Sequence, residues 1–290
     1  MSNSSPIIPP SRWSLGAIAA RAADDRANKL ADVGWQLAFY GRSIAFTPLA
    51  LRRYPRETAR LLGEVCFGTG GLALIGGTLG VMIGMTMFTG AVVGLQGYSS
   101  LKQLGTAALT GFISAYFNTR EVAPLSAGLA LSATVGCGFT AQLGAMRISE
   151  EVDALEVMAV RSLPYLVTTR VIAGFVAVIP LYVVGLLTSY LGARQTTIWV
   201  YGQSGGTYDH YFHLFLPPVD VFWSFLKVVI FALVVILAHC YYGYTARGGP
   251  AGVGVAVGRA VRASIVLIAV TDFFLSLAVW GSTTTVRIAG

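Results

Sequence analysis

The residues most suited to catalysis or binding are the carboxylates between Arg147 and Val160. This stretch holds four of the 13 acidic residues of the chain, namely Glu150, Glu151, Asp153 and Glu156. On a helix its apolar residues share an arc of about 60° that excludes the carboxylates, and they are Ile148, Val152, Leu155 and Ala159. A helix of this length, about 20 Å, is too polar to cross a bilayer. We expect either an exposed docking helix for another protein or an amphipathic loop helix that rests on its own protein.

Two further groups of ionisable residues have chemistry to consider. Asp209, His210 and His213 have a spacing that suits zinc, but the aromatic residues among them favour an interfacial belt, so we predict no metal site. Asp272 lies near the middle of an apolar stretch, where a charge is costly unless it is protonated or faces the protein interior or a wet cavity. It serves either a hydrogen bond to a neighbouring helix or substrate passage with proton linkage. His239 is expected to be a hydrogen-bonded packing residue.

The sequence contains no recognisable catalytic motif. No lysine follows the glycine of a phosphate-binding loop, so the chain does not hydrolyse ATP by that route. There is no nucleophile elbow, zinc-protease motif or dinucleotide fingerprint, and we therefore predict no catalytic residue. Cys66, Cys137 and Cys240 lie in apolar runs without metal-binding spacing and are expected to be inert thiols.

The candidate residues must be held by membrane helices, because the composition excludes a soluble protein. Of the 290 residues, 55% are hydrophobic and 11% are charged, and the mean hydropathy is +0.68. Soluble domains carry about 25% charged residues. We predict an all-α, polytopic helical membrane protein with about five transmembrane helices. The pI of about 9.5 does not indicate nucleic-acid binding, because the basic residues flank the apolar runs and are not interleaved with base-stacking side chains.

The apolar runs locate the spans. The expected spans cover residues 66–92, 122–144, 171–193, 221–244 and 260–286. Residues 102–119 fit an outer-surface helix, a re-entrant piece or the start of a long tilted span. A polar loop is expected at residues 194–220 and a glycine-rich turn at 245–257. Lys227, in the first turns of its span, is expected to extend its ammonium group outward to the membrane surface.

Small residues repeat every four positions in the first two spans. The first stripe comprises Gly76, Gly80 and Gly84, and the second includes Gly128, Ser132 and Gly136. Such stripes let neighbouring helices approach closely. They serve either packing within the chain or a dimer seam around a lipid-sized cavity.

The N-terminal region and the basic residues predict the topology. Residues 1–15 are polar and predict a disordered cytoplasmic tail, whereas residues 16–63 predict interfacial amphipathic helices, with a soluble helical hairpin as the alternative. With the N-terminus in the cytoplasm and five spans, most basic residues fall on the inner side of the plasma (inner) membrane. The acidic segment then lies in the cytoplasm. The basic residues expected outside are Lys102, Arg120, Arg194, Lys227 and Arg287.

Several stretches resemble the YrbE/MlaE permease family, the membrane subunits of lipid-transporting ABC systems that work with MCE proteins. The resemblance begins around Leu61 and predicts a permease domain over residues 64–290. The acidic block is its most specific part, and the glycine-rich matches are weaker. The matching stretches are Gly94–Tyr98, Glu121–Pro124, Thr140–Gly144, Glu150–Val160, Arg170, Tyr242–Tyr244 and Asp272–Phe273.

The resemblance implies a function and a set of partners. The chain would pair with a paralogous YrbE-type permease, and MCE proteins would lie on the outer side. A separate cytoplasmic ABC ATPase dimer, which binds ATP and Mg, would dock on a coupling helix at residues 147–160. The cargo would be phospholipids, fatty or mycolic acids, or sterols, with import as the expected direction, and this chain itself would hold no cofactor. The residues implied in coupling are Arg147, Glu150, Glu151, Asp153, Leu155 and Glu156.

Two departures from the family pattern refine this expectation. Gln142 stands where many members have Glu, and Arg161-Ser162 stands where they have Asp-Pro. The departures fit the B-type subunit of an actinobacterial Mce lipid transporter and favour a heterodimer. Two other functions remain open, namely an ion- or proton-coupled secondary transporter that uses Asp272 and a structural membrane anchor.

Overall fold

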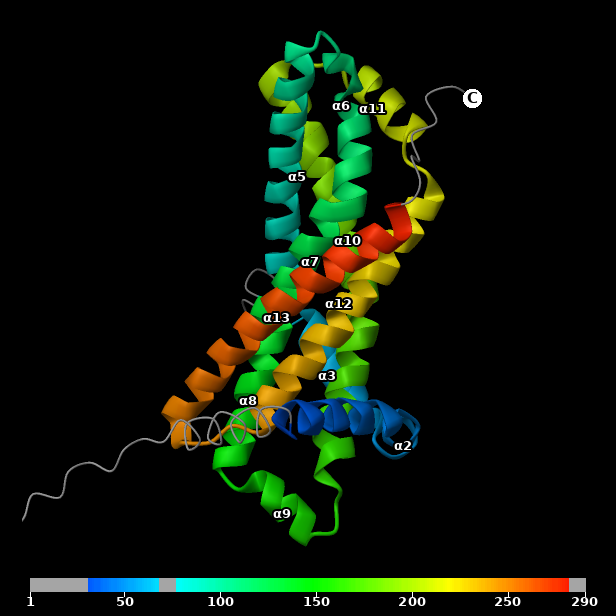
Figure 1. Cartoon of the computed structure of the whole chain (residues 1–290). Helices are drawn as coiled ribbons and strands as arrows, with labels where there is room; N and C mark the ends of the chain where they lie inside the picture. Colours follow the sequence, from blue (N-terminus) through cyan, green and yellow to red (C-terminus); the bar gives the residue numbers. More distant parts are fainter. Residues whose placement is uncertain (1–30, 68–76, 282–290) are drawn as a thin grey trace, which may run out of the picture. The chain divides into compact units, whose positions relative to one another are not determined.

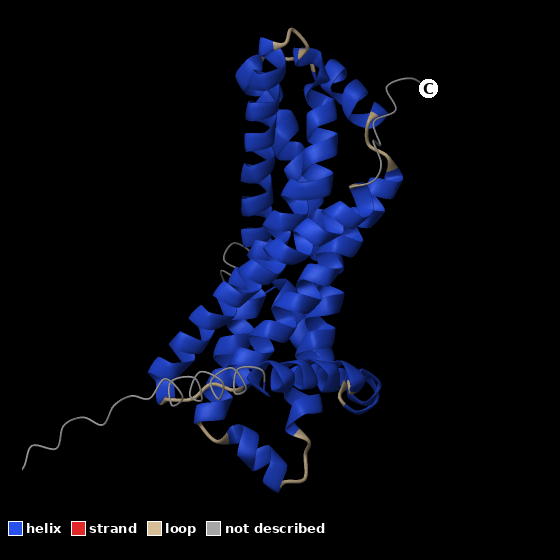
Figure 2. Cartoon of the chain, viewed as in Figure 1, coloured by secondary structure: helices blue, strands red, loops and turns tan. Residues whose placement is uncertain are grey.

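The computed structural model describes residues 31–67 and 77–281, and in this part of the chain every regular element is helical (Figures 1 and 2). The chain forms two compact units, Met1–Arg42 and Ser43–Gly290. In the described part of the first unit, which is helical, Trp35 is 69% exposed and Leu37 is 63% exposed. The expected tail at residues 1–15 lies outside the described residues.

Helices α2 (Thr47–Arg53) and α3 (Pro55–Phe67) belong to the second unit, although we expected the permease domain to begin only at Glu64. Helix α3 lies against α10 (Thr169–Tyr201) and buries Leu61 and Val65. Periodicity identifies an apolar helix face but does not distinguish a protein partner from lipid. Helix α3 therefore packs on the bundle, and the expected start of the permease domain at Glu64 stays a prediction.

Five helical stretches of the described chain are long and apolar enough to cross a membrane, which confirms the predicted polytopic fold. They are α5 (Thr78–Gln103), the compound helix Ala107–Ile148, the compound helix Leu163–Tyr201, α12 (Pro218–Tyr244) and α13 (Gly249–Trp280). Short connections reverse the chain between them, so α9 (Glu151–Val157) and α11 (Gly205–Leu214) lie at opposite ends of the bundle (Figure 1). We refer to these as the α9 end and the α11 end.

Residues 107–119 form the start of the second long helix, so the structure selects one of the three options for this region. The compound helix consists of η1 (Ala107–Leu109), α6 (Thr110–Ile113), η2 (Ser114–Val122), α7 (Ala123–Leu131), η3 (Ser132–Gly136) and α8 (Cys137–Ile148). Elements η2 and η3 are π-helical, as is η4 (Leu163–Thr168) at the start of the third long helix. Pro124 follows η2, and its missing N–H removes a regular helical hydrogen bond there. Widened turns of this kind are frequent at functional positions.

The first span was predicted too early in the chain. Helix α5 begins at Thr78 and continues to Gln103, whereas we expected residues 66–92. Cys66 belongs to α3 instead. Apolar composition marks the part of a helix that suits lipid, but backbone hydrogen bonding carries the helix further into polar residues.

The third and fifth long helices also exceed their predicted bounds. Helix α10 runs to Tyr201, and α11 occupies part of the expected loop at residues 194–220. Helix α13 begins at Gly249, where we expected a turn. Gly248 has a left-handed φ of 92°, and the proline that follows Gly249 is favoured in the first turn of a helix. The turn before α13 is therefore confined to residues 245–248.

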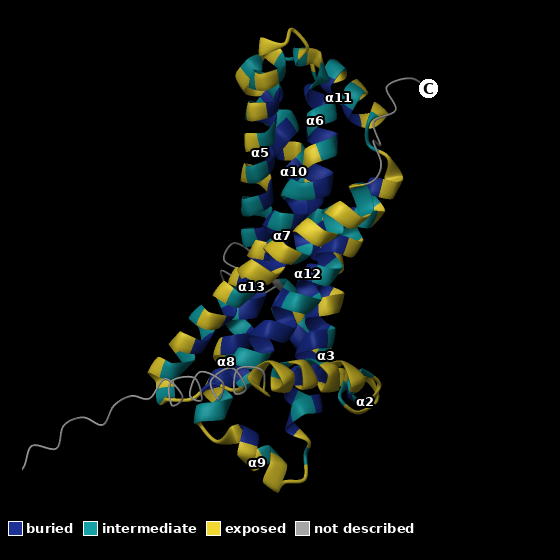
Figure 3. Cartoon of the chain, in the orientation of Figure 1, coloured by how far each residue is buried: buried dark blue, intermediate teal, exposed yellow. Residues whose placement is uncertain are grey.

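Helices α5 and α10 approach closely through glycine. A Cβ added at Gly90 would lie 2.1 Å from the carbonyl oxygen of Ser189, and one added at Gly192 would lie 2.2 Å from that of Met87. Any side chain at either position would force the two helices apart. Exposed apolar side chains lie on other faces of the long helices (Figure 3), including Phe88 at 75% and Phe222 at 64% exposure. Such faces suit contact with lipid or with another membrane protein.

Candidate functional site

The acidic segment is not the single helix that we predicted over residues 147–160. It contains a short helix, α9, with a bend on each side, and we call residues 147–160 the elbow. Helix α8 ends at Ile148, and α9 covers only Glu151–Val157. Glu150 has a left-handed φ of 62° and Ala159 a left-handed φ of 59°. The predicted helix bounds were wrong because these two residues, in a conformation uncommon for residues with a side chain, interrupt the helix on both sides of α9.

The elbow is anchored to the long helices by one apolar side chain and one serine. Val152 is 0% exposed. The Ser162 hydroxyl donates to Oε1 of Glu156 at 2.7 Å and lies 2.8 Å from the hydroxyl of Tyr244 at the end of α12. These contacts link α9 to the segment before α10 and to α12.

The charged residues of the elbow remain at its surface. Nη1 of Arg147 lies 2.6 Å from Oδ1 of Asp153, and Ser149 donates to Glu151 at 3.0 Å. Leu155 is half-buried. All four carboxylates of the segment are exposed, namely Glu150, Glu151, Asp153 and Glu156. The structure thus brings the six residues that we assigned to coupling into one surface elbow, and their role in coupling stays a prediction.

Sequence reasoning missed the apolar tip of the elbow. Val157 is 89% exposed and Met158 is 64% exposed. Both lie outside the apolar arc that contains Val152 and Leu155, so periodicity gave a signal that they point away from the protein. Two exposed apolar side chains beside four carboxylates make this surface suitable for contact with another protein.

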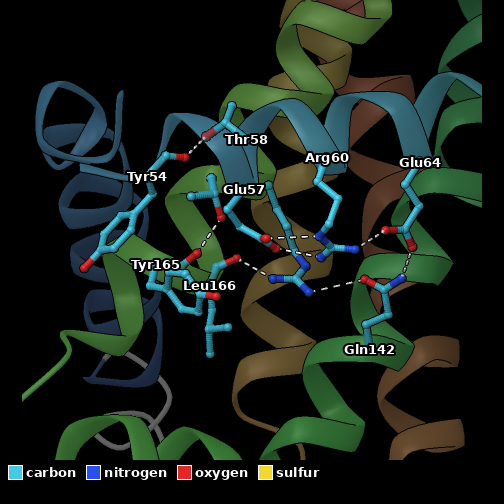
Figure 4. A network of polar contacts seen from close by, with 10 residues as sticks. Tyr54, Glu57, Thr58, Arg60, Glu64, Gln142, Tyr165 and Leu166 are labelled. Carbon is cyan, nitrogen blue, oxygen red and sulfur yellow. Dashed lines mark hydrogen bonds and ion pairs between the residues drawn. The ribbon is translucent and has the colours of Figure 1, made fainter. Parts of the chain in front are cut away.

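A polar network joins α3, α8 and α10 near the α9 end (Figure 4). Arg60 lies 2.6 Å from a carboxylate oxygen of Glu57 and 3.2 Å from one of Glu64. Glu64 accepts a hydrogen bond from Nε2 of Gln142 at 2.6 Å, and Oε1 of Gln142 accepts one from Arg170 at 3.2 Å. The network therefore connects the surface of α3 to a buried arginine of α10 through one amide of α8.

Gln142 is suited to this position because an amide both donates and accepts. An ionised carboxylate would accept from Arg170 but would have no hydrogen to donate to Glu64. Arg170 is 2% exposed and also donates to the carbonyl oxygen of Leu166 at 2.7 Å. The glutamine that we noted as a departure from the family pattern thus makes one contact, with Glu64, that an ionised glutamate would not reproduce.

The surface part of this network stabilises its charges. The side-chain hydrogen bond from Arg60 is the main cause that lowers the pKa of Glu57, and the same bond raises the pKa of Arg60. The Arg60 side chain is 59% exposed, so water and salt screen the pair. These residues therefore stay ionised near neutral pH and contribute orientation more than stability.

Lys227 forms the centre of a buried charge cluster nearer the α11 end. Its Nζ lies 2.6 Å from Oδ1 of Asp272 and 3.0 Å from Oε2 of Glu121, and it donates to Oγ of Ser276 at 2.7 Å. Ser276 donates in turn to Oε1 of Glu121 at 2.7 Å. Lys227 is only 2% exposed. The predicted outward extension was wrong, because acceptors on η2 and α13 replace water around the ammonium group.

Arg120 and Asp220 extend this cluster. Nη2 of Arg120 lies 2.6 Å from Oδ2 of Asp220, and these residues are 4% and 5% exposed. The indole Nε1 of Trp280 donates to Oδ1 of Asp220 at 3.1 Å, and the carbonyl oxygen of Arg120 accepts from Lys227 at 2.9 Å. We call this set the lysine cluster, and its charged members are Arg120, Glu121, Asp220, Lys227 and Asp272.

The lysine cluster removes two basic residues from the set that we used to predict topology. We counted Arg120 and Lys227 as charges on the outer side, but both are buried inside the bundle. They are consequently not free charges that report topology. The cluster holds two cations and three carboxylates, and Asp272, for which the sequence indicated no partner, is held by Lys227.

His239 is buried in a hydroxyl-rich contact among α8, α12 and α13. It is 0% exposed, and its Nδ1 lies 2.8 Å from Oγ1 of Thr140. Ser132 lies 3.2 Å from its Nε2 and 2.6 Å from Oγ of Ser264. A Cβ at Gly136 would lie 2.6 Å from Cδ2 of the imidazole, so this glycine makes room for the ring. The expected packing role of His239 is confirmed.

The two predicted small-residue stripes have different surroundings. In the first, Gly76 lies outside the described residues, Gly80 is half-buried, and Gly84 has no atom within 4 Å of an added Cβ. Close approach on α5 occurs instead further along the helix at Gly90. In the second stripe, a Cβ at Gly128 would meet Phe231 at 3.2 Å, and Gly136 and Ser132 contact the His239 site. The sequence alone could not identify which glycines face a helix and which face outward.

The candidate zinc residues form a different contact at the α11 end. Nε and Nη2 of Arg194 both donate to Asp209 at 2.8 Å, which occupies its carboxylate oxygens. Hydrogen bonding by Arg194 is the main cause that lowers the pKa of Asp209. His210 and His213 are exposed, and within residues 31–67 and 77–281 no group of three metal-binding side chains comes together.

Comparison with known proteins matches the region that contains the five long helices. A family model described as Permease MlaE matches residues 70–278. A probable ABC transporter permease protein of Rickettsia bellii is 30% identical over 199 residues, which cover 69% of this chain and 77% of that protein. The chloroplastic protein TRIGALACTOSYLDIACYLGLYCEROL 1 of Arabidopsis thaliana is 31% identical over 203 residues, with 69% and 57% coverage. The intermembrane phospholipid transport system permease protein MlaE of Haemophilus influenzae is 28% identical over 198 residues, with 68% and 76% coverage.

Proposed function

Because the chain belongs to the MlaE permease family, we propose that it is a lipid-transporter permease on which a separate cytoplasmic ATPase acts through α9. The observation that carries this proposal is the anchored elbow. Its carboxylates and the tip formed by Val157 and Met158 are exposed, while Val152 is fully buried. The surface offered to a partner is thus attached to the membrane helices by a buried side chain and by the hydrogen bonds of Ser162.

The geometry supports a mechanism in which α9 transmits motion to the spans. Closure of the ATPase would push on the exposed face of α9, which the left-handed residues Glu150 and Ala159 bound on either side. Displacement would reach α12 through the contact of Ser162 with Tyr244. The partner would bind the ATP and Mg, and this chain would supply the contact surface and the lipid path.

The remaining parts of the assembly are proposed from the family and from charge. Arg147 lies at the end of α8, Arg161 follows α9, and Arg247 lies in the turn between α12 and α13, next to the end of α8. These positions favour placing the α9 end and the N-terminus in the cytoplasm of a plasma-membrane protein. MCE proteins would then bind at the α11 end. The phospholipid transport name of the Haemophilus relative supports a lipid cargo. We propose import of hydrophobic lipids, including fatty or mycolic acids, phospholipids or sterols.

A second, related permease would complete the membrane part of the transporter. Gly84 faces open space on α5, and large apolar side chains such as Phe88 are exposed on the same helix. This surface is available for a heterodimer seam beside a lipid-sized cavity. We propose a B-type member of a two-permease pair from the Arg161-Ser162 departure in the sequence. In the structure Ser162 contributes an anchoring contact of the elbow.

Ion coupling through Asp272 is less favoured as a function. Its carboxylate lies 2.6 Å from Nζ of Lys227, and this contact gives it a structural partner. A carboxylate that carries protons must exchange them with water during transport, whereas this one is paired with a buried cation. Family membership gives an energy source that does not require such exchange.

The test is co-purification of an ATPase with the full-length protein from mild detergent. The Glu151→Lys/Asp153→Lys variant should lose the ATPase, and Val157→Ser/Met158→Ser should weaken its retention. Asp32→Lys, an exposed change of the same charge sign outside the elbow, is the control and should retain it. An ATPase that stays bound to both elbow variants would refute the proposal.

A further inference from the structure

A pocket of about 400 Å³ lies between the end of α2 and the segment that follows α9. It is lined by Leu49, Arg53, Tyr54, Ala159, Arg161 and Pro164. No carboxylate is among these residues. The lining therefore combines two guanidinium groups and a phenol with the apolar surfaces of Leu49 and Pro164, and it has the size of a small-ligand site.

The two arginines of this pocket have no anionic partner in the described part of the chain. Neighbouring arginines do, since Arg60 pairs with Glu57 and Arg147 pairs with Asp153. Arg53 and Arg161 are exposed, and no carboxylate of residues 31–67 or 77–281 lies within ion-pair distance of either. Guanidinium groups match the geometry of phosphate oxygens, which they bind through paired hydrogen bonds.

Part of the pocket wall is held in place before any ligand binds. The rings of Tyr54 and Tyr165 meet edge to face with their centres 5.0 Å apart. Pro164 is buried at the beginning of the third long helix. A site whose wall is fixed in this way loses less conformational entropy when it takes up a ligand.

The position of the pocket indicates the source of the phosphate. It lies where a long apolar helix begins, next to the basic end of α2, and this is the level of a lipid headgroup layer. The geometry points to a binding site for the phosphate headgroup of an anionic phospholipid in the leaflet at the α9 end. Its acyl chains would lie outside the pocket along the apolar helix surface, apart from any transported cargo.

Such a lipid would join two segments that are distant in the sequence. Its phosphate would bridge Arg53 of α2 and Arg161 of the segment after α9, next to the left-handed Ala159. The bound headgroup would restrain that end of the elbow. The site does not depend on the identity of the cargo or on ATPase binding.

Native mass spectrometry of the full-length protein in detergent tests this site, with phosphatidylglycerol and phosphatidylcholine as probes. Wild type should bind phosphatidylglycerol more tightly than phosphatidylcholine. Arg53→Gln/Arg161→Gln should weaken phosphatidylglycerol binding about tenfold, because two cations that contact the headgroup are removed. The matched control is Arg52→Gln/Arg56→Gln, which removes two exposed arginines outside the pocket and should change binding by less than about twofold.

Three results would overturn the inference. Equal losses in the two double variants would indicate a diffuse basic surface, and equal affinity of wild type for both lipids would exclude headgroup selection. Displacement of phosphatidylglycerol by millimolar inorganic phosphate would indicate a soluble anion as the ligand. The melting temperatures of both double variants should match that of wild type, because all four arginines are exposed.

If the pocket variant melts at a lower temperature than wild type, Arg53→Lys/Arg161→Lys replaces it. For this variant we expect reduced phosphatidylglycerol binding with an unchanged melting temperature.

Discussion

Nζ of Lys227 in α12 lies 2.6 Å from Oδ1 of Asp272 in α13, and the lysine is 2% exposed. The same ammonium group contacts Glu121, which lies in η2 of the second long helix. One buried cation therefore fixes the lateral positions of three long helices. Glu121 and Asp272 belong to two separate stretches that carry the family resemblance, and the structure brings them together.

We predict that Lys227→Gln destabilises the protein more than Asp272→Asn does. Loss of the lysine leaves three carboxylates with only Arg120 as a cation, whereas loss of the aspartate leaves two cations and two carboxylates. Removing one partner from a buried charged network costs about 3–5 kcal/mol. The cost should approach that range for Lys227→Gln and lie well below it for Asp272→Asn, as measured by thermal unfolding in detergent.

The double variant Lys227→Gln/Asp272→Asn supplies the control for this prediction. It retains one cation and two carboxylates, so it should be more stable than Lys227→Gln alone. If the aspartate variant proved the less stable of the two single variants, the charge balance that we assign to the lysine cluster would be incorrect.

Gly192→Ala should separate α5 from α10. The added Cβ would lie 2.2 Å from the carbonyl oxygen of Met87, and this atom belongs to the backbone and has little freedom to move. Overpacking of this kind costs about 1–3 kcal/mol or more. The melting temperature of the purified protein measures the effect.

Gly84→Ala is the matched control on α5, because nothing lies within 4 Å of its added Cβ. In the isolated chain it should be neutral or stabilising by up to about 1 kcal/mol, since alanine favours the helix. In the proposed heterodimer it should weaken association if α5 forms the seam. A Gly84→Ala loss equal to that of Gly192→Ala in the isolated chain would contradict the assigned helix contacts.

Gln142→Glu should destabilise the network between α3 and α10. The new carboxylate would face Glu64 across the present 2.6 Å contact, where the amide hydrogen is lost. A gained charge contact with Arg170 offsets part of this loss, so we expect a net cost of about 1–3 kcal/mol. The compensating variant Gln142→Glu/Glu64→Gln restores a donor and should recover most of the stability in thermal unfolding.

Asp209→Asn should reduce stability in a pH-dependent manner. Arg194 lowers the pKa of Asp209 below its ordinary value of 3.8. The pair therefore contributes stability above that value, and the contribution is lost as the pH falls through the lower pKa of the folded protein. The difference in melting temperature between wild type and variant should be constant near neutral pH and shrink below about pH 3.8. In an Arg194→Gln background the same substitution should show no such dependence.

The fold class followed from composition and periodicity, because a chain with 55% hydrophobic residues must bury them in lipid or in protein. The number of spans followed as well, since each requires about 20 apolar residues. The ends of the helices did not. Helix α5 extends to Gln103 and α13 begins at Gly249, because hydrogen bonding and local turn geometry, not hydropathy, end a helix.

The candidate site was predicted in its location but not in its construction. The acidic block identified the elbow, yet its apolar periodicity runs through Glu150 and did not indicate the left-handed conformation of that residue. The bridging role of Gln142 requires both Glu64 and Arg170 to lie beside it, and both are far from it in the chain.

The sequence by itself determined that this protein is a helical membrane permease of the MlaE family with an acidic segment between two spans. Those properties depend on composition, period and local motifs, which are all readable along the chain. Only the tertiary structure decided that Lys227 neutralises Asp272 and that Gly90, but not Gly84, meets a neighbouring helix. Such pairings depend on the rotation and depth of each helix against the others, and these are set by the packing of the whole bundle.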